Sequence, residues 1–140
     1  MRQADVEDAL RVLQRARDAA ERAHATRDQA VAARAALQER MQRLHAKAAR
    51  TAGQLGLRDH YRAQLRSQLD SVDERMRATG RAFRAATQAV AAAQQQVELA
   101  LRAREAAEAQ RNADEKLDAR KRERRDQAAA DDRWRPPRRS

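Results

Sequence analysis

The sequence of 140 residues has no cysteine, only three glycines and two prolines, and 2% aromatic residues. Without cysteine there are no disulfides and no thiol chemistry. So few glycines and prolines cannot supply the turns of a β protein. No apolar run approaches the roughly 20 residues that span a bilayer, and the N-terminus lacks the apolar core of a secretory signal. We therefore expect a cytoplasmic protein with no transmembrane segment.

Alanine and arginine dominate what is present. The chain has 35 alanines and 28 arginines against three lysines, and 37% of its residues are charged. Such a composition with helical periodicity is typical of long helices and coiled coils. The net charge is +10, of which residues 1–104 carry +8 and residues 105–140 carry +2. Because the excess is spread along the chain, the concentrated basic arm of a DNA-binding tail is not evident.

Apolar residues recur at alternating steps of three and four over residues 6–55. Twelve of the fifteen positions are apolar, and the exceptions are Arg27, Arg34 and Thr51. A sustained seven-residue period implies a left-handed supercoil with a partner helix. The positions are Val6, Ala9, Leu13, Ala16, Ala20, Ala23, Arg27, Ala30, Arg34, Leu37, Met41, Leu44, Ala48, Thr51 and Leu55.

A second stretch repeats the pattern over residues 65–107, with eleven of thirteen positions apolar. After Ala107 the next positions would be Arg111, Asp114, Asp118 and Lys121, so the apolar stripe ends although helix propensity stays high. The thirteen positions are Leu65, Leu69, Val72, Met76, Thr79, Phe83, Ala86, Val90, Ala93, Val97, Ala100, Arg104 and Ala107.

The two stretches are complementary when the chain is folded about residue 55, because facing residues then have numbers that sum to about 110. Large residues meet near the tip, and alanines meet further along. Gly53 and Gly56 lie between the stretches, and we expect one of them to end the first helix in a left-handed conformation.

These observations predict an all-α fold, a long antiparallel two-helix coiled-coil hairpin with an overhanging C-terminal helix. The first helix covers the second only to about residue 104, so the overhang projects about 40 Å at 1.5 Å per residue. We expect one helical unit over residues 1–132, with helices at about 3–52 and 59–132, a turn at about 53–58, and a disordered tail at 133–140.

Two arginines interrupt the first stripe, and each falls opposite an apolar residue of the second. Arg27 falls opposite Phe83, and Arg34 falls opposite Met76. We expect each arginine to lay its methylenes along the seam and lift its guanidinium to water, and contacts with Phe83 or Asp73 would help to fix the register. Gly80 lies inside the second helix, where it costs about 1 kcal/mol relative to alanine. It marks either a bend or a close helix approach.

No catalytic or metal-binding constellation is evident. There is no phosphate-binding glycine-rich loop, and His24, His45 and His60 are too far apart to share a metal ion. We therefore expect a protein that is not an enzyme, with no cofactor, metal or small-molecule substrate.

The aromatic residues Tyr61 and Trp134 are isolated, so there is no stacking platform for nucleic acid. The narrow, alanine-rich stripe suits another helix better than a membrane surface.

Residues 115–134 carry a resemblance to a known family. They form a charged helix with the run Arg124-Arg125-Asp126-Gln127 followed by the acidic pair Asp131-Asp132. With Leu10-Arg-Val-Leu13 and the alanine- and arginine-rich heptads that follow it, this pattern resembles the FliJ/YscO family of type III secretion stalk proteins.

The resemblance implies an antiparallel coiled coil like that of the rotary ATPase γ subunit. Such a protein sits in the pore of the hexameric secretion ATPase and links it to the export gate, and secretion chaperones are further partners. It would be cytoplasmic and held at the inner membrane by the secretion apparatus. By analogy the N-terminus and overhang contact the ATPase and the tip points toward the gate. The candidate contact residues are Arg111, Arg120, Arg124, Arg125, Asp131 and Asp132 in the overhang, and Leu55, Leu57 and Tyr61 at the tip.

Two other interpretations remain open. The chain is alternatively a basic coiled-coil adaptor or nucleoid-type protein that binds nucleic acid, in which case its affinity should fall steeply with salt. A third possibility is a scaffold segment that assembles into larger bundles.

Overall fold

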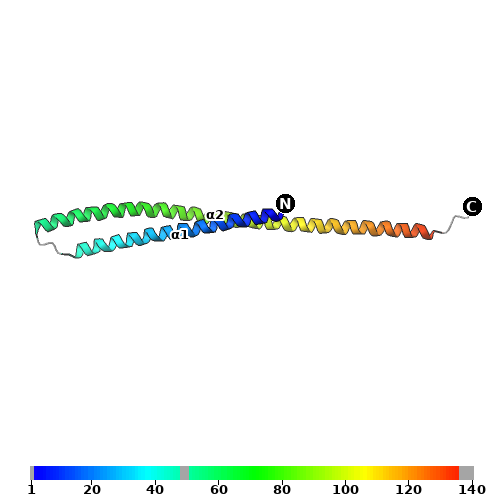
Figure 1. Ribbon diagram of the computed structural model, residues 1–140, viewed down its shortest axis with the longest axis horizontal. Helices are drawn as coiled ribbons and strands as arrows, with labels where there is room; N and C mark the ends of the chain where they lie inside the picture. The colour runs from blue at the N-terminus through cyan, green and yellow to red at the C-terminus, as the bar shows by residue number, and fades with distance from the viewer. Residues whose placement is uncertain (1, 48–50, 136–140) are drawn as a thin grey trace, which may run out of the picture.

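The protein is all-helical over the residues that the computed structural model describes, 2–47 and 51–135. Helix α1 spans Arg2–Ala46 and helix α2 spans Ala52–Trp134. The two helices pack against each other along α1, and α2 then continues alone beyond the start of α1 (Figure 1). Within the described ranges, neither helix has a segment that is apolar enough to cross a membrane.

Contacts between the helices follow one trend. His45 lies beside Arg62, with His45 Nδ1 and an Arg62 guanidinium nitrogen 3.2 Å apart. Arg34 Nε donates to Asp73 Oδ1 at 2.7 Å, and further along the rod the Arg27 guanidinium lies 5.2 Å from the centre of the Phe83 ring. In these three pairs, a lower residue number on α1 therefore goes with a higher residue number on α2.

The core is a single seam between two helices, at the positions that the heptad pattern predicts. All thirteen positions of the second stretch are buried or half-buried, and so is every position of the first stretch up to Leu44 except Arg27, which is exposed. Thr51 and Leu55 are exposed, and Ala48 lies outside the described residues. The most buried apolar side chains are Val6, Leu13, Ala30, Leu37, Leu65 and Ala93.

The connection between the helices differs from the sequence-based expectation. Helix α1 ends at Ala46 rather than near residue 52, and α2 begins at Ala52 rather than near residue 59. Gly53 and Gly56 therefore lie inside α2, and no described glycine has a positive φ. The reason is a capping-box sequence, Thr51-Ala-Gly-Gln54, in which the Thr51 hydroxyl accepts a hydrogen bond from Gln54 N at 3.1 Å.

The C-terminal boundary also differs. We expected a disordered tail from residue 133, but α2 continues through Trp134. Arg135 then adopts an extended conformation, with φ −64° and ψ 123°. Pro136 follows it in the sequence, and the residue before a proline is disfavoured in the helical region. The proline thus sets the helix end, and the rest of the expected tail, residues 136–140, lies outside the described residues.

The polar residues of the seam make the two contacts that their register allows. Arg34 and Asp73 form an ion pair whose side chains are 41% and 34% exposed. Phe83 is flanked by the Arg27 guanidinium and by the His24 ring, whose centroid lies 5.5 Å from that of Phe83. Gly80 does not mark a close helix approach, because a Cβ built there meets no atom within 4 Å.

Candidate partner-binding surfaces

The overhang is the part of α2 that α1 does not cover. Every described residue after Ala107 is exposed, as far as Arg135. The stretch from Ala107 to Trp134 extends about 40 Å at the helical rise. Its residues are mostly strong helix formers, and the side-chain amide of Gln110 donates to Asp114 at 3.1 Å within it. A single helix is thus presented to solvent on all sides.

The charged residues expected to bind a partner lie on more than one side of this helix. Arg111, Arg125 and Asp132 are separated by multiples of seven residues, so they follow one line that continues the seam. The other three follow a second line, at steps of four and seven. No side chain of residues 115–135 forms an ion pair with another described residue. All six are exposed: Arg111, Arg120, Arg124, Arg125, Asp131 and Asp132.

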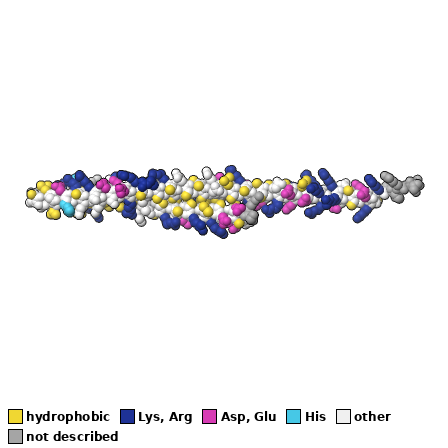
Figure 2. Space-filling view, turned by 90° about the horizontal axis from the view of Figure 1, so that it is seen from above, with side chains coloured by type: hydrophobic (Ala, Val, Ile, Leu, Met, Phe, Trp, Pro, Cys, Tyr) yellow, Lys and Arg dark blue, Asp and Glu magenta, His cyan; other side chains and the backbone are white. Residues whose placement is uncertain are grey.

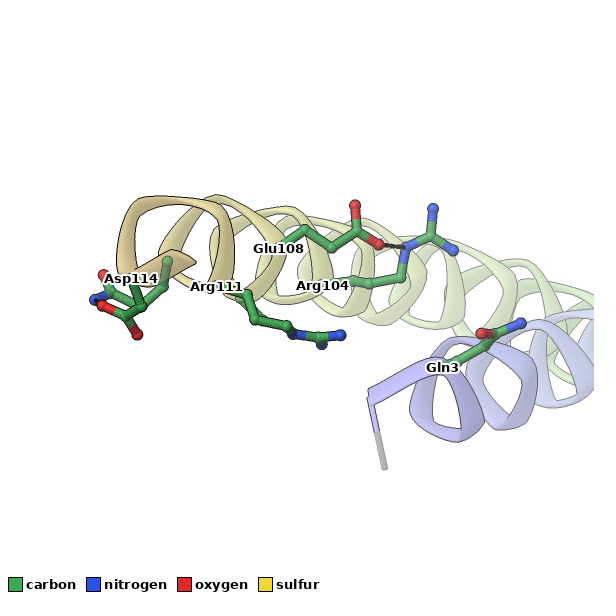
Figure 3. A pocket seen from close by; sticks show the side chains of 7 residues that line it. Gln3, Arg104, Glu108, Arg111 and Asp114 are labelled. Carbon is green, nitrogen blue, oxygen red and sulfur yellow. Dashed lines mark hydrogen bonds and ion pairs between the residues drawn. The ribbon is translucent and has the colours of Figure 1, made fainter. Parts of the chain in front are cut away.

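A cavity marks the step where α1 begins beside α2. Arg104 lies at its edge, with its Nε 3.6 Å from Glu108 Oε1 and buried without a hydrogen bond. In Figure 3, Arg111 extends along α2 toward the start of α1, where Gln3 is the labelled residue. The structure therefore brings one predicted residue, Arg111, to the junction between the paired and unpaired parts. The lining residues are Gln3, Arg104, Ala107, Glu108, Gln110, Arg111 and Asp114.

The three tip residues lie in the first turns of α2, not in a loop. Leu55, Leu57 and Tyr61 are 48%, 72% and 50% exposed. Leu57 and Tyr61 are four residues apart and share one side of the helix, whereas Leu55, two residues before Leu57, points to another. The structure therefore brings two of the three predicted tip residues together.

Two arginines that the sequence analysis missed tie the start of α2 to the last turn of α1. Arg58 donates to the backbone oxygen of His45 at 3.2 Å, and Arg62 contacts the His45 ring. An arginine that reaches a C-terminal carbonyl satisfies a group that the helix leaves unpaired. Extending the heptad pattern backward from Leu65 gives positions 62 and 58, so the spacing alone identifies both arginines.

The sequence analysis also missed an uncharged line along α2, beside the seam. It includes the exposed side chains Leu99 and Leu117, which are 55% and 51% accessible. Its twelve positions carry no charge in a chain that is 37% charged, and all are exposed. Figure 2 shows hydrophobic side chains gathered along the middle of one face, where charged side chains are sparse. The positions are 78, 82, 85, 89, 92, 96, 99, 103, 106, 110, 113 and 117.

A groove opens between the helices at Gly80. Two of its lining residues are apolar, namely Val31, which is 45% exposed, and the half-buried Met76. Besides Gly80 itself, the remaining lining residues are the arginines Arg27, Arg77, Arg81 and Arg84.

Residues 2–47 and 51–135 contain no group of three or more His, Asp or Glu side chains placed to hold a metal ion. Comparisons with protein-family models, with curated proteins and with solved structures give no match for this chain.

Proposed function

We propose that this chain is a non-enzymatic stalk protein of a bacterial type III secretion system, similar to the FliJ/YscO family, that links the hexameric secretion ATPase to the export gate. In this proposal α1 and α2 form an antiparallel coiled-coil hairpin. The falling and rising residue numbers of the contacting pairs support that arrangement, as does burial at heptad positions.

The observation that carries the proposal is the overhang. Beyond the start of α1, a single exposed helix continues for about 40 Å. The charged side chains of residues 115–135 lie on more than one side of it and form no ion pair with a described residue. A partner that lies along one side of a helix contacts only one line of residues. Charges around the helix suit a partner that surrounds it, as the pore of a ring does. The thicker two-helix part outside the ring would supply the stiffness to transmit position or torque.

A binding experiment with the cognate hexameric ATPase tests this proposal. The full chain should be retained by the immobilised ATPase, and a chain without residues 105–140 should not. Charge reversal by Arg120→Glu with Arg124→Glu should weaken retention, because both side chains are exposed on the overhang. The matched control reverses Arg15 and Arg22, which are exposed on α1. Full binding by the truncated chain would remove the overhang from the interface.

A basic adaptor that binds nucleic acid is the second candidate. The four arginines at the Gly80 groove support it, because none of them pairs with a carboxylate of the described chain. Its signature is an affinity that falls steeply with salt. A mobility-shift titration with duplex and single-stranded DNA tests it, and the absence of a shift at low ionic strength would exclude it.

A further inference from the structure

Neither the backbone conformation nor a close contact requires glycine at position 80. Its φ is not positive, so the backbone does not require a glycine there. A Cβ would meet no atom within 4 Å, so packing against α1 does not require one either. Glycine in a helix interior is destabilising relative to alanine. What the missing side chain does is leave open the groove between Val31 and Met76.

The arginines around this groove repel one another. Arg77, Arg81 and Arg84 lie at steps of four and three on α2, where like charges destabilise a helix. Arg27 approaches from α1 and lies over the Phe83 ring. None of these four arginines forms an ion pair with a described residue. An anionic group in the groove would relieve this repulsion.

Three carboxylates lie on the neighbouring turns: Asp28, Asp73 and Glu74. Glu74, three residues before Arg77, lines a shallow pocket with Arg77 and Arg81 but forms no ion pair with a described residue. Asp73, one turn before Arg77, binds Arg34 at 2.7 Å. Asp28, next to Arg27 in the sequence, lies 3.3 Å from the His24 ring. The four arginines of the groove outnumber these three carboxylates, one of which is already paired with Arg34, so the groove keeps a net positive charge.

The groove is also partly apolar. Val31 is 45% exposed although it is β-branched and apolar, and the half-buried Met76, four residues before Gly80, also lines the groove. A ligand that matches both features carries negative charge and an apolar side chain. Nucleic acid would use the charges but not the apolar lining, and the Phe83 ring is not free for base stacking because Arg27 and His24 lie against it.

We infer that the groove at Gly80 is a docking site for an acidic peptide segment of a partner protein, which places an apolar side chain beside Gly80 and carboxylates on Arg27, Arg77, Arg81 and Arg84. This site lies away from the overhang and does not depend on the proposed role in secretion. Loss of ATPase binding on truncation of residues 105–140 and loss of peptide binding here are separate outcomes.

Fluorescence anisotropy of labelled peptides with the full chain tests the inference. The probe is a helical 20-residue peptide with leucine at steps of three and four and glutamate on the flanks. Three comparison probes replace leucine by serine, replace glutamate by lysine, or are a DNA oligonucleotide of equal charge. The leucine–glutamate peptide should bind most tightly, and both altered peptides should bind at least about fivefold more weakly.

Two substitutions locate the site. Gly80→Leu places a bulky side chain in the groove at a position where a Cβ meets no atom within 4 Å, and it should weaken binding of the probe about tenfold. Its control is Ala92→Leu, which places the same side chain at an exposed position of α2 outside the groove. Arg81→Gln should weaken binding of the probe peptide by up to about fivefold, which is the effect expected for the loss of one exposed ion pair. Its control, Arg102→Gln, removes an exposed arginine elsewhere on α2 and should have no effect.

The outcomes are decisive in each arm. Unchanged binding by Gly80→Leu, or equal losses for Arg81→Gln and Arg102→Gln, would overturn the site. Equally tight binding of the DNA probe that is insensitive to Gly80→Leu would show general phosphate binding and also overturn it. Sedimentation of the chain alone gives a further test, because self-association abolished by Gly80→Leu would mean that a second copy fills the groove. If Gly80→Leu lowers the helicity measured by circular dichroism, the comparison of Arg81→Gln with Arg102→Gln decides whether the groove is the binding site.

Discussion

Shortening Leu37 to alanine measures how much the seam between α1 and α2 stabilises the protein. Leu37 is 9% exposed, whereas Leu117 on the overhang is 51% exposed and has no second helix beside it. Leu→Ala removes the equivalent of three CH₂ groups, about 2.4 kcal/mol at 0.8 kcal/mol each when they are buried. Because the seam borders solvent, the free-energy cost of a cavity left by the shorter side chain adds little to this value. We expect a loss of about 2–3 kcal/mol for Leu37→Ala, near the low end for buried leucines.

Leu117→Ala is the matched control and should change the free energy of unfolding by less than about 0.5 kcal/mol, as exposed substitutions do. Urea unfolding followed by circular dichroism gives both values, with the m-value checking that the same surface is exposed. Equal losses for the two variants would mean that the overhang is packed as firmly as the seam. That result would refute the division of α2 into a covered and an uncovered part.

Three further predictions concern single features. In a double-mutant cycle, Arg34→Ala and Asp73→Ala should show a coupling free energy of about 0.5–1 kcal/mol. This coupling should exceed that of the exposed pair Arg43–Glu39, because the Arg34 and Asp73 side chains are partly buried. No coupling would refute the contact. Gly80→Ala should raise the free energy of unfolding by about 0.5–1 kcal/mol, and a loss would mean that the added methyl is not accommodated. Thr51→Ala should cost about 0.5–2 kcal/mol by removing the N-cap, and hydrogen exchange should become faster at the Gln54 amide; unchanged exchange there would contradict the cap.

The seam could be predicted from the sequence because period and burial have the same cause. A residue at every third or fourth position faces the same neighbour, so the pattern that ends at Ala107 also locates the end of coverage. The pairing register placed Arg27 opposite Phe83 and Arg34 opposite Met76, and Phe83 and Asp73 were named as contacts that would help to fix the register. The structure confirms both contacts.

The helix boundaries were predicted less well. Gly53 and Gly56 suggested a helix end, but glycine only permits a left-handed conformation and does not impose it. The Thr51 side chain instead offers an oxygen to the first free amides, and that interaction sets the start of α2. The groove at Gly80 could not be predicted, because it depends on which side chains of α1 lie across from the glycine. The heptad pattern gives the neighbours in the seam but not the open space beside it.

The assignment of the overhang as the ATPase-binding part is tested most directly by site-specific photo-cross-linking to the cognate hexameric ATPase. A photoreactive residue at Arg124, exposed on the overhang, should form a cross-linked product with the ATPase. The same residue at Gln95, exposed on α2 where α1 covers the seam, should not. Cross-linking from Gln95 and none from Arg124 would contradict the assignment.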